Sequence, residues 1–165
     1  MEVYGDFQVN VRRALTEIDE DWEWYVGLVI CGSHTPRQTE LESLISNIKV
    51  CRERRYPFLG ICYGFQIAAL EYARNVLGIQ DATSEEFKAF GTAIVKKRKD
   101  GLNVGHKNGE SYWNNFEVDL PNWVIPKNFF VTQAHPEYES MIGKPHRLLK
   151  DFLKHAREYT RTMAV

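Results

Sequence analysis

The stretch "PFLGICYGFQ", Pro57 to Gln66, places one cysteine between two glycines at the end of an apolar run. The apolar residues before the cysteine are typical of a strand buried in a parallel sheet, and the residues after it have helical spacing. Strand, sharp turn and helix in this order indicate a nucleophile elbow, with cysteine in the place of the usual serine. Gly60 and Gly64 then have a steric purpose, because a tight turn at Cys62 leaves little room for neighbouring side chains.

A turn of this kind determines where the thiol of Cys62 lies and how it ionises. It directs the side chain out of the carboxyl edge of the sheet, where α/β proteins bind their ligands. It also places the sulfur at the N-terminus of a helix, whose dipole favours the thiolate. We therefore expect Cys62 to be a partly exposed thiol of low pKa that reacts before Cys31 or Cys51. A motif this short needs the support of a second one.

The second motif is "VTQAHPEYES", in which His135 and Glu137 follow another predicted strand. Residues two apart in an extended chain point the same way, so the imidazole and the carboxylate can align. A cysteine nucleophile needs a base, and the base needs a third group that fixes its tautomer and orientation. A structural histidine is the alternative for His135 taken alone. Beside an elbow cysteine, the pattern favours a catalytic pair.

Strands and helices alternate along the rest of the chain. Apolar runs predict buried strands, and apolar residues at helical spacing predict amphipathic helices. Strands are expected at 25–31, 56–61 and 128–133, and helices at 6–19, from Pro36 after a cap at Thr35, at 65–78 and from Pro145. The basic run 96–99 leads into Asp100-Gly101, which we interpret as the solvated tip of a hairpin. The alternation predicts a mostly parallel α/β sheet covered on both faces, with a small antiparallel hairpin.

The composition limits the classes of function. The chain has 165 residues and a net charge of −1, which favours a single domain over 1–165 and gives no reason to expect a nucleic acid or a membrane as partner. We expect the end of the chain, 157–165, to be frayed. No apolar run approaches the ~20 residues of a membrane span. Three cysteines without an apolar leader are typical of a reduced, cytoplasmic chain. The histidines lack the spacing of metal ligands, so no metal site is expected.

Three stretches, "PFLGICYGFQIAALEYARNVLG", "DATSEEF" and "QAHPEYES", resemble class I (triad) glutamine amidotransferases, in particular the glutaminase domain of CTP synthase. The resemblance implies a flavodoxin-like three-layer fold that needs no cofactor. It also implies hydrolysis of glutamine, or of a related small amide, through a glutamyl thioester with release of ammonia. Because the chain is short, we interpret it as a minimal, free-standing relative that supplies ammonia to a separate synthetase partner.

Residue roles follow from this resemblance position by position. Cys62 would be the nucleophile, His135 the acid and base, and Glu137 the group that orients the histidine. The oxyanion positions of the family fall on Gly32 and Tyr63, and its substrate-binding positions fall on Gly64, Gln66, Glu86 and Asn115. Among these, the carboxylate of Glu86 would bind the ammonium group of the substrate.

Two positions depart from the family's pattern. The oxyanion strand of the family normally reads PGGFG, whereas the corresponding stretch here is "CGSHTPR", in which Gly32 is retained. Loss of one oxyanion donor typically lowers the rate by about 10²–10³. Asn115 occupies the place of an arginine that grips the substrate carboxylate, and asparagine cannot form that bidentate, charged contact. Three alternatives stay open: a glutaminase completed by its partner, a hydrolase of another γ-glutamyl or amide compound, and a non-catalytic amidotransferase-like binding protein.

Overall fold

A three-stranded parallel sheet forms the centre of the protein in the computed structural model. Its strand order is β10–β4–β3, with bounds Phe129–Thr132, Phe58–Ile61 and Leu28–Ile30. Both pairings are parallel, and β4 lies in the middle. β4 is buried along its whole length, as expected for a strand covered on both faces. The structure describes residues 2–4, 7–9, 25–34, 36–87, 90–141 and 143–163.

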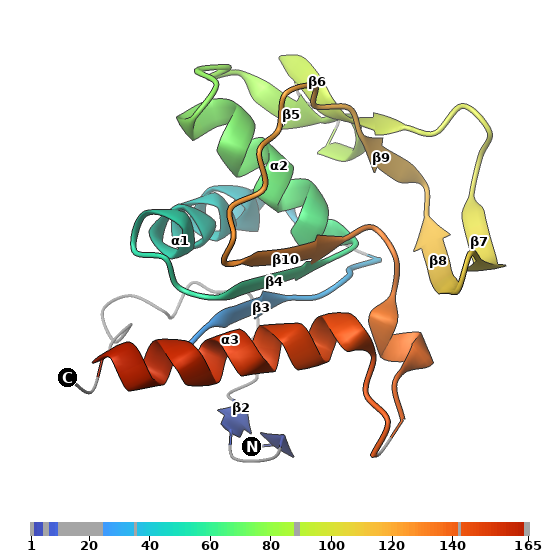
Figure 1. Ribbon diagram of the computed structural model, residues 1–165. Helices are drawn as coiled ribbons and strands as arrows, with labels where there is room; N and C mark the ends of the chain where they lie inside the picture. Colours follow the sequence, from blue (N-terminus) through green and yellow to red (C-terminus); the bar gives the residue numbers. More distant parts are fainter. Residues whose placement is uncertain are drawn as a thin grey trace.

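Helices cover both faces of this sheet. On one face lie α1 and α2, and along the other runs α3 (Figure 1), with bounds Leu41–Glu53, Tyr63–Asn75 and Arg147–Met163. The larger core lies between the sheet and the first two helices and contains Phe58 and Leu70. The smaller core lies under α3, where Phe152 packs with Ile61. The predicted three-layer α/β architecture is therefore confirmed. Within the described residues, no helix combines the length and the apolarity that crossing a membrane requires.

The first described residues differ from the prediction. β1 (Glu2–Tyr4) and β2 (Phe7–Val9) form an antiparallel pair, so the helix expected at 6–19 is wrong at its beginning. The aromatic and β-branched residues of this stretch favour strands, and that preference prevails over apolar spacing that also fits a helix. The remainder of the predicted helix, from residue 10 onward, lies outside the described residues.

Two helix ends also differ from the prediction. The helix expected from Pro36 begins only at Gln38, as the single turn η2 (Gln38–Glu40) that leads into α1, because Arg37 is still extended with φ −110° and ψ 126°. The proposed cap at Thr35 lies outside the described residues. At the other end of the chain, residues 157–163 continue α3 instead of fraying. Tyr159 supports this last part, since its ring packs 4.8 Å from that of Tyr56.

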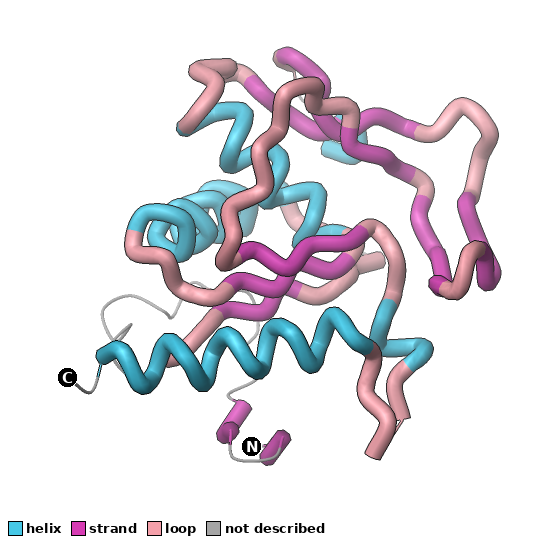
Figure 2. The backbone as a smooth tube through the Cα atoms, viewed as in Figure 1, coloured by secondary structure: helices cyan, strands magenta, loops and turns pink. Residues whose placement is uncertain are grey.

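A second group of strands extends beyond the central sheet (Figure 2). β5 (Ala82–Ser84), β6 (Thr92–Lys97) and β9 (Phe116–Val118) form a small mixed sheet, and β7 (Asn103–Lys107) pairs with β8 (Glu110–Asn114). We call the last pair the β7–β8 hairpin.

The predicted hairpin tip at Asp100-Gly101 is wrong. β6 pairs with β9 and not with β7, so the residues after the basic run form a turn between two paired segments. The tip of the β7–β8 hairpin is Asn108-Gly109, where both residues have positive φ, 55° and 82°. A two-residue hairpin turn needs positive φ at both positions, and asparagine followed by glycine adopts it readily. Both dipeptides are turn signals, and strand pairing decides between them.

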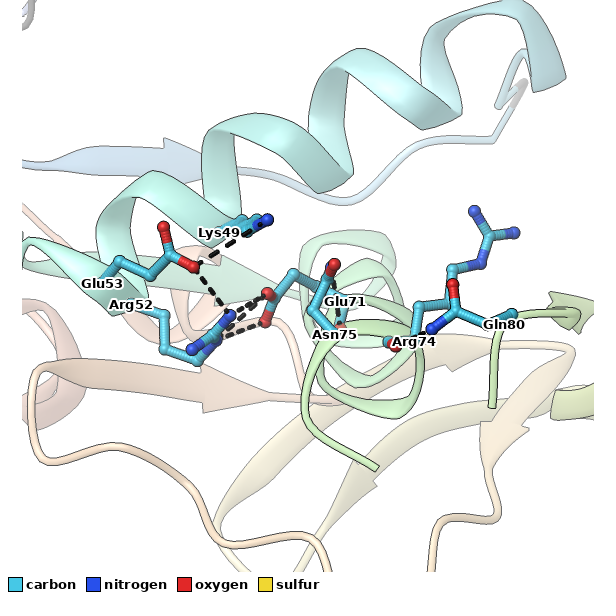
Figure 3. A network of polar contacts seen from close by, with 7 residues as sticks. All are labelled: Lys49, Arg52, Glu53, Glu71, Arg74, Asn75 and Gln80. Atoms are coloured by element: carbon cyan, nitrogen blue, oxygen red, sulfur yellow. Dashed lines mark hydrogen bonds and ion pairs between the residues drawn. The ribbon is translucent and has the colours of Figure 1, made fainter. Parts of the chain in front are cut away.

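A buried ion pair joins α1 to α2 (Figure 3). Glu71 on α2 is fully buried, and Arg52 on α1 contacts both of its carboxylate oxygens. Nε of Arg52 lies 3.0 and 3.1 Å from the two oxygens, and its Nη2 lies 2.8 Å from Oε1. A bidentate contact fixes direction as well as distance, so it sets how α2 lies against α1.

We expect Arg52→Met to lower the free energy of unfolding by about 3–5 kcal/mol, because it leaves the Glu71 carboxylate buried without a partner. Denaturant unfolding followed by circular dichroism measures the change. Lys49→Met is the matched control: Lys49 and Glu53 are both exposed and 3.9 Å apart, so their loss should cost no more than about 1 kcal/mol. The double variant Arg52→Met/Glu71→Met should regain most of the stability. Equal losses for Arg52→Met and Lys49→Met would contradict this assignment.

Candidate functional site

Cys62 occupies the turn between β4 and α2, as the sequence predicts. Its backbone has φ 51° and ψ −98°, and its N–H donates to the carbonyl of Thr132 at 2.8 Å, which ties the turn to the end of β10. The flanking glycines are sterically required. A Cβ at Gly64 would lie 2.1 Å from the carbonyl oxygen of Ile30, and a Cβ at Gly60 would lie 2.9 Å from the backbone of Gly64. The chain therefore forms a strand–turn–helix elbow at the carboxyl edge of the sheet.

The ionisation of Cys62 differs from the prediction. The residue is only 7% exposed, and burial raises the pKa of its thiol to about 11. The backbone N–H of Tyr63 at the helix N-terminus lowers this pKa, whereas the carboxylate of Glu137 raises it further. Desolvation of the thiolate exceeds the effect of the helix end. The prediction that Cys62 is a partly exposed thiol of low pKa is therefore wrong for the free protein.

His135 is buried and held on three sides. Its backbone N–H donates to the backbone carbonyl of Ser111 at 2.7 Å, and its ring stacks on that of Tyr138 with the ring centres 4.8 Å apart. Nδ1 lies 2.6 Å from Oε1 of Glu137, which comes from the single turn η4 (Pro136–Glu139). The alignment of His135 with Glu137 that their spacing predicts is therefore present. The contact fixes the ring so that Nε2 faces away from the carboxylate.

Cys62 and His135 meet at a backbone carbonyl. Sγ of Cys62 lies 3.8 Å from the carbonyl oxygen of Trp113 on β8, and Nε2 of His135 lies 3.4 Å from the same oxygen. Among the described residues, no direct hydrogen bond joins the thiol to the ring. Gly32 lies beside both groups, since a Cβ there would be 2.8 Å from Cε1 of His135 and 3.4 Å from Cβ of Cys62. A side chain at position 32 would separate the thiol from the imidazole.

Gln133 belongs to the site, although the sequence analysis missed it. Its Nε2 donates to Sγ of Cys62 at 3.4 Å, and its Oε1 accepts from Nε2 of Gln66 at 3.2 Å. Gln66 is itself buried on the first turns of α2. The available signal was position: Gln133 directly follows β10, so it stands at the same carboxyl edge as the elbow. The amide of Gln133 can stabilise negative charge on the sulfur.

A pocket of about 430 Å³, measured with its open mouth, lies over the thiol. It is lined by Ser33, His34, Cys62, Tyr63, Gln66, Glu86, Trp113, Asn114 and Asn115. Five of the predicted site residues therefore line the pocket: Cys62, Tyr63, Gln66, Glu86 and Asn115. The other four, Gly32, Gly64, His135 and Glu137, are not among its lining residues. Trp113 and Asn114 were missed, because they belong to the β7–β8 hairpin, whose course the sequence did not predict.

The side chains around this pocket differ in polarity. Glu86, on the single turn η3 (Glu85–Phe87), is half-buried, and burial raises the pKa of its carboxyl group. The hydroxyl of Tyr63 is buried and has no hydrogen-bond partner in the described structure. At the mouth, the rings of His34 and Trp113 meet edge to face with their centres 5.9 Å apart. The described residues contain no group of three or more side chains that could hold a metal ion.

The fold and the elbow define a flavodoxin-like α/β protein with a thiol at the carboxyl edge of its sheet. The family model "Glutamine amidotransferase class-I" matches residues 3–156, and the chain belongs to this family. The predicted resemblance is thereby confirmed.

Its relatives include CTP synthases. The chain is 40% identical over 88 residues to CTP synthase of Rickettsia conorii, covering 53% of this chain and 15% of that protein. It is 33% identical over 164 residues to CTP synthase of Carboxydothermus hydrogenoformans, covering 94% of this chain and 29% of that protein. The chain thus spans less than a third of the length of either relative.

Two solved structures share the fold. The glutaminase domain of Trypanosoma brucei CTP synthase with bound acivicin superposes with a TM-score of 0.65 at 22% identity, over 81% of this chain and 71% of that one. A putative GMP synthase protein from Thermoplasma acidophilum gives 0.57 at 21% identity, over 88% and 79%. These likenesses establish the flavodoxin-like architecture.

The burial of the three cysteines predicts how they react. We expect iodoacetamide, which recognises no site, to label the exposed Cys31 before Cys62, and to leave the buried Cys51 unlabelled in the folded protein. A chloroketone analogue of glutamine should reverse the order and label Cys62 first, because binding in the pocket places its carbon at the thiol. Mass spectrometry of peptides after brief reaction distinguishes the two patterns. Cys62 as the first site for iodoacetamide would indicate an activated thiol in the free protein.

Proposed function

We propose that the chain is a glutaminase-type amidotransferase in which Cys62, His135 and Glu137 release ammonia from the side-chain amide of glutamine. The observation that carries the proposal is their convergence. The thiol and the ring approach one carbonyl oxygen from two sides, at 3.8 and 3.4 Å, while Glu137 holds the far nitrogen of the ring at 2.6 Å. Membership of the class-I family supports the reaction type.

In the first half of the reaction, the sulfur of Cys62 attacks the amide carbon and its proton passes to Nε2 of His135. The carbonyl oxygen becomes an oxyanion, which the backbone N–H of Tyr63 stabilises. The C–N bond then breaks, His135 returns the proton to the leaving nitrogen, and ammonia departs from a glutamyl thioester. In the second half, His135 takes a proton from water, which attacks the thioester. The C–S bond breaks, glutamate leaves, and the thiol forms again.

Each supporting group has a defined task in this sequence. Because burial raises the pKa of Cys62 to about 11, the thiol keeps its proton at neutral pH until His135 removes it. Glu137 then stabilises the imidazolium ion, and Gln133 stabilises the charge that develops on sulfur. At the other end of the pocket, Glu86 is the group that receives the ammonium of the substrate.

The Trp113 carbonyl supports a role for a partner. With Nδ1 bonded to Glu137, the ring can accept the thiol proton only through Nε2, and Nε2 faces this carbonyl. A carbonyl oxygen has no proton to give. If Nε2 carries a proton toward it, the ring is an imidazolium and is no longer a base. We therefore propose that the β7–β8 hairpin moves before catalysis, and we assign that movement to the binding of an ammonia-accepting synthetase.

Glu139 anchors the β7–β8 hairpin, and a partner that moves the hairpin would have to release this anchor. Oε1 of Glu139 on η4 accepts from Ser111 Oγ on β8 and lies 2.9 Å from Nδ1 of His106 on β7. The cross-strand pair Val104 and Trp113, which are 46% and 48% exposed, offers apolar surface beside the pocket for contact with another protein. Binding there would couple ammonia release to the presence of an acceptor.

Steady-state glutamate release from glutamine tests the function. We expect weak turnover by the isolated chain and a rise of at least ~10²-fold with the correct synthetase, the size of one restored oxyanion interaction. Cys62→Ser should abolish both activities, and proteins encoded beside the chain are the partners to try. Complete inactivity under every condition, with Cys62 unreactive toward the glutamine analogue, would identify a non-catalytic binding protein instead.

The hairpin anchor gives a separate prediction. Glu139→Gln removes the charge that holds Ser111 and His106, so we expect turnover of the isolated chain to rise roughly tenfold, the effect of one charge-assisted hydrogen bond on the open fraction. The matched control is Glu110→Gln on the same hairpin, whose carboxylate accepts from Tyr112 within β8. Turnover and the rate of Cys62 labelling by the glutamine analogue should increase together. A decrease, or an equal effect of both substitutions, would show that the hairpin does not restrain the site.

A further inference from the structure

The charges around the pocket carry information about its substrate. Among the described residues that line it, Glu86 is the one side chain with a formal charge at neutral pH when His34 is neutral. The remaining lining groups are amides, hydroxyls, the thiol and aromatic rings. The described lining therefore has a net charge of −1 and contains no lysine or arginine. A ligand that carries one positive charge and no negative charge balances this lining.

Free glutamine does not meet this condition. Its ammonium group can pair with Glu86, but its α-carboxylate then enters a pocket in which the described lining offers no permanent cation. Removing a carboxylate from water without a partner of opposite charge is costly, and the carboxylate of Glu86 repels it as well. When the α-carboxyl group is converted to an amide, the same molecule becomes a cation and the penalty disappears.

Neutral groups of the pocket suit such an amide. Asn115 lies exposed at the pocket and offers both a donor and an acceptor. The hydroxyl of Tyr63 is buried without a hydrogen-bond partner in the described structure, and it adds no charge to the lining at neutral pH. Trp113 at the mouth is 48% exposed, which leaves a surface for whatever follows the amide bond.

We propose that the pocket selects glutamine whose α-carboxyl group is masked as an amide or peptide bond, with its α-ammonium free, in preference to free glutamine. The inference rests on the proposed function, because the bond that breaks is the same C–N bond of the γ-amide. The thiol forms the thioester, ammonia leaves, and water releases glutamic acid that keeps its α-amide. A peptide with N-terminal glutamine belongs to the same class.

Comparison of L-glutamine with L-glutamine α-amide as substrates of the complete protein tests the proposal. Chromatography separates the two products, glutamate and glutamic acid α-amide. We expect kcat/KM for the α-amide to exceed that for glutamine by roughly tenfold, as for one hydrogen-bonded charge. Asn115→Arg should invert the preference by supplying the missing cation. Gln80→Arg, which adds the same charge in the exposed loop after α2, should leave the ratio unchanged.

The outcomes separate this inference from the proposed function. Equal turnover of the two compounds, or a preference for glutamine, overturns the inference and leaves the glutaminase function standing. If neither compound is hydrolysed, the proposed function fails, and calorimetry with Cys62→Ser decides the selectivity of the pocket. Tighter binding of the α-amide, lost in Glu86→Gln, would then support the inference, whereas equal or weaker binding would overturn it.

Discussion

The contact between the first turn of α2 and the backbone of β3 is the constraint on which the rest of the site depends. With 2.1 Å between a Cβ at Gly64 and the carbonyl oxygen of Ile30, only glycine lets the helix begin this close to the sheet. The chain must then reverse within one residue, and Cys62 takes the positive φ that this requires. The Arg52–Glu71 ion pair holds the same helix farther along its length. One backbone contact, the positive φ of Cys62 and one ion pair therefore place the thiol before any other residue of the site contributes.

The same closeness buries the thiol and keeps it protonated in the free protein. A helix that starts directly on the sheet buries its first residue, so desolvation raises the pKa of Cys62 although the N–H of Tyr63 opposes it. The thiol and the imidazole are both buried, and both lie against the Trp113 carbonyl. Under the proposed function, activation then comes from the partner that moves the β7–β8 hairpin. In this proposal, the reactivity of Cys62 depends on β8 as well as on the elbow.

The sequence predicted those parts of the fold and site that depend on local pattern. Apolar runs located β3, β4 and β10, and the two-residue spacing of His135 and Glu137 predicted their contact. The rest depends on contacts between distant segments. A backbone carbonyl such as that of Trp113 has no residue-type signal, and Gln133 could be found only from the strand order. The dipeptides Asp100-Gly101 and Asn108-Gly109 are equivalent as local turn signals, and only the pairing of β6 with β9 decides which of them is a hairpin tip. The sequence therefore misplaced the hairpin that contributes to the pocket.

The proposals place different physical requirements on the two parts of the pocket, at the thiol and at Glu86. At the thiol, the proposed proton transfer from Cys62 to His135 depends on geometry, because the Trp113 carbonyl lies against both groups. At Glu86, the proposed selectivity is electrostatic, because one carboxylate in an otherwise neutral lining would favour a ligand of charge +1 over a zwitterion. β8 and the residue after it contribute to both parts of the pocket. The Trp113 carbonyl lies at the thiol, and Asn115, two residues farther along the chain, also lines the pocket. Movement of β8 would open the proton path from Cys62 to His135 and would change the pocket at Asn115 in the same step. A bulky group beyond a masked α-carboxyl could therefore itself favour the state in which β8 has moved.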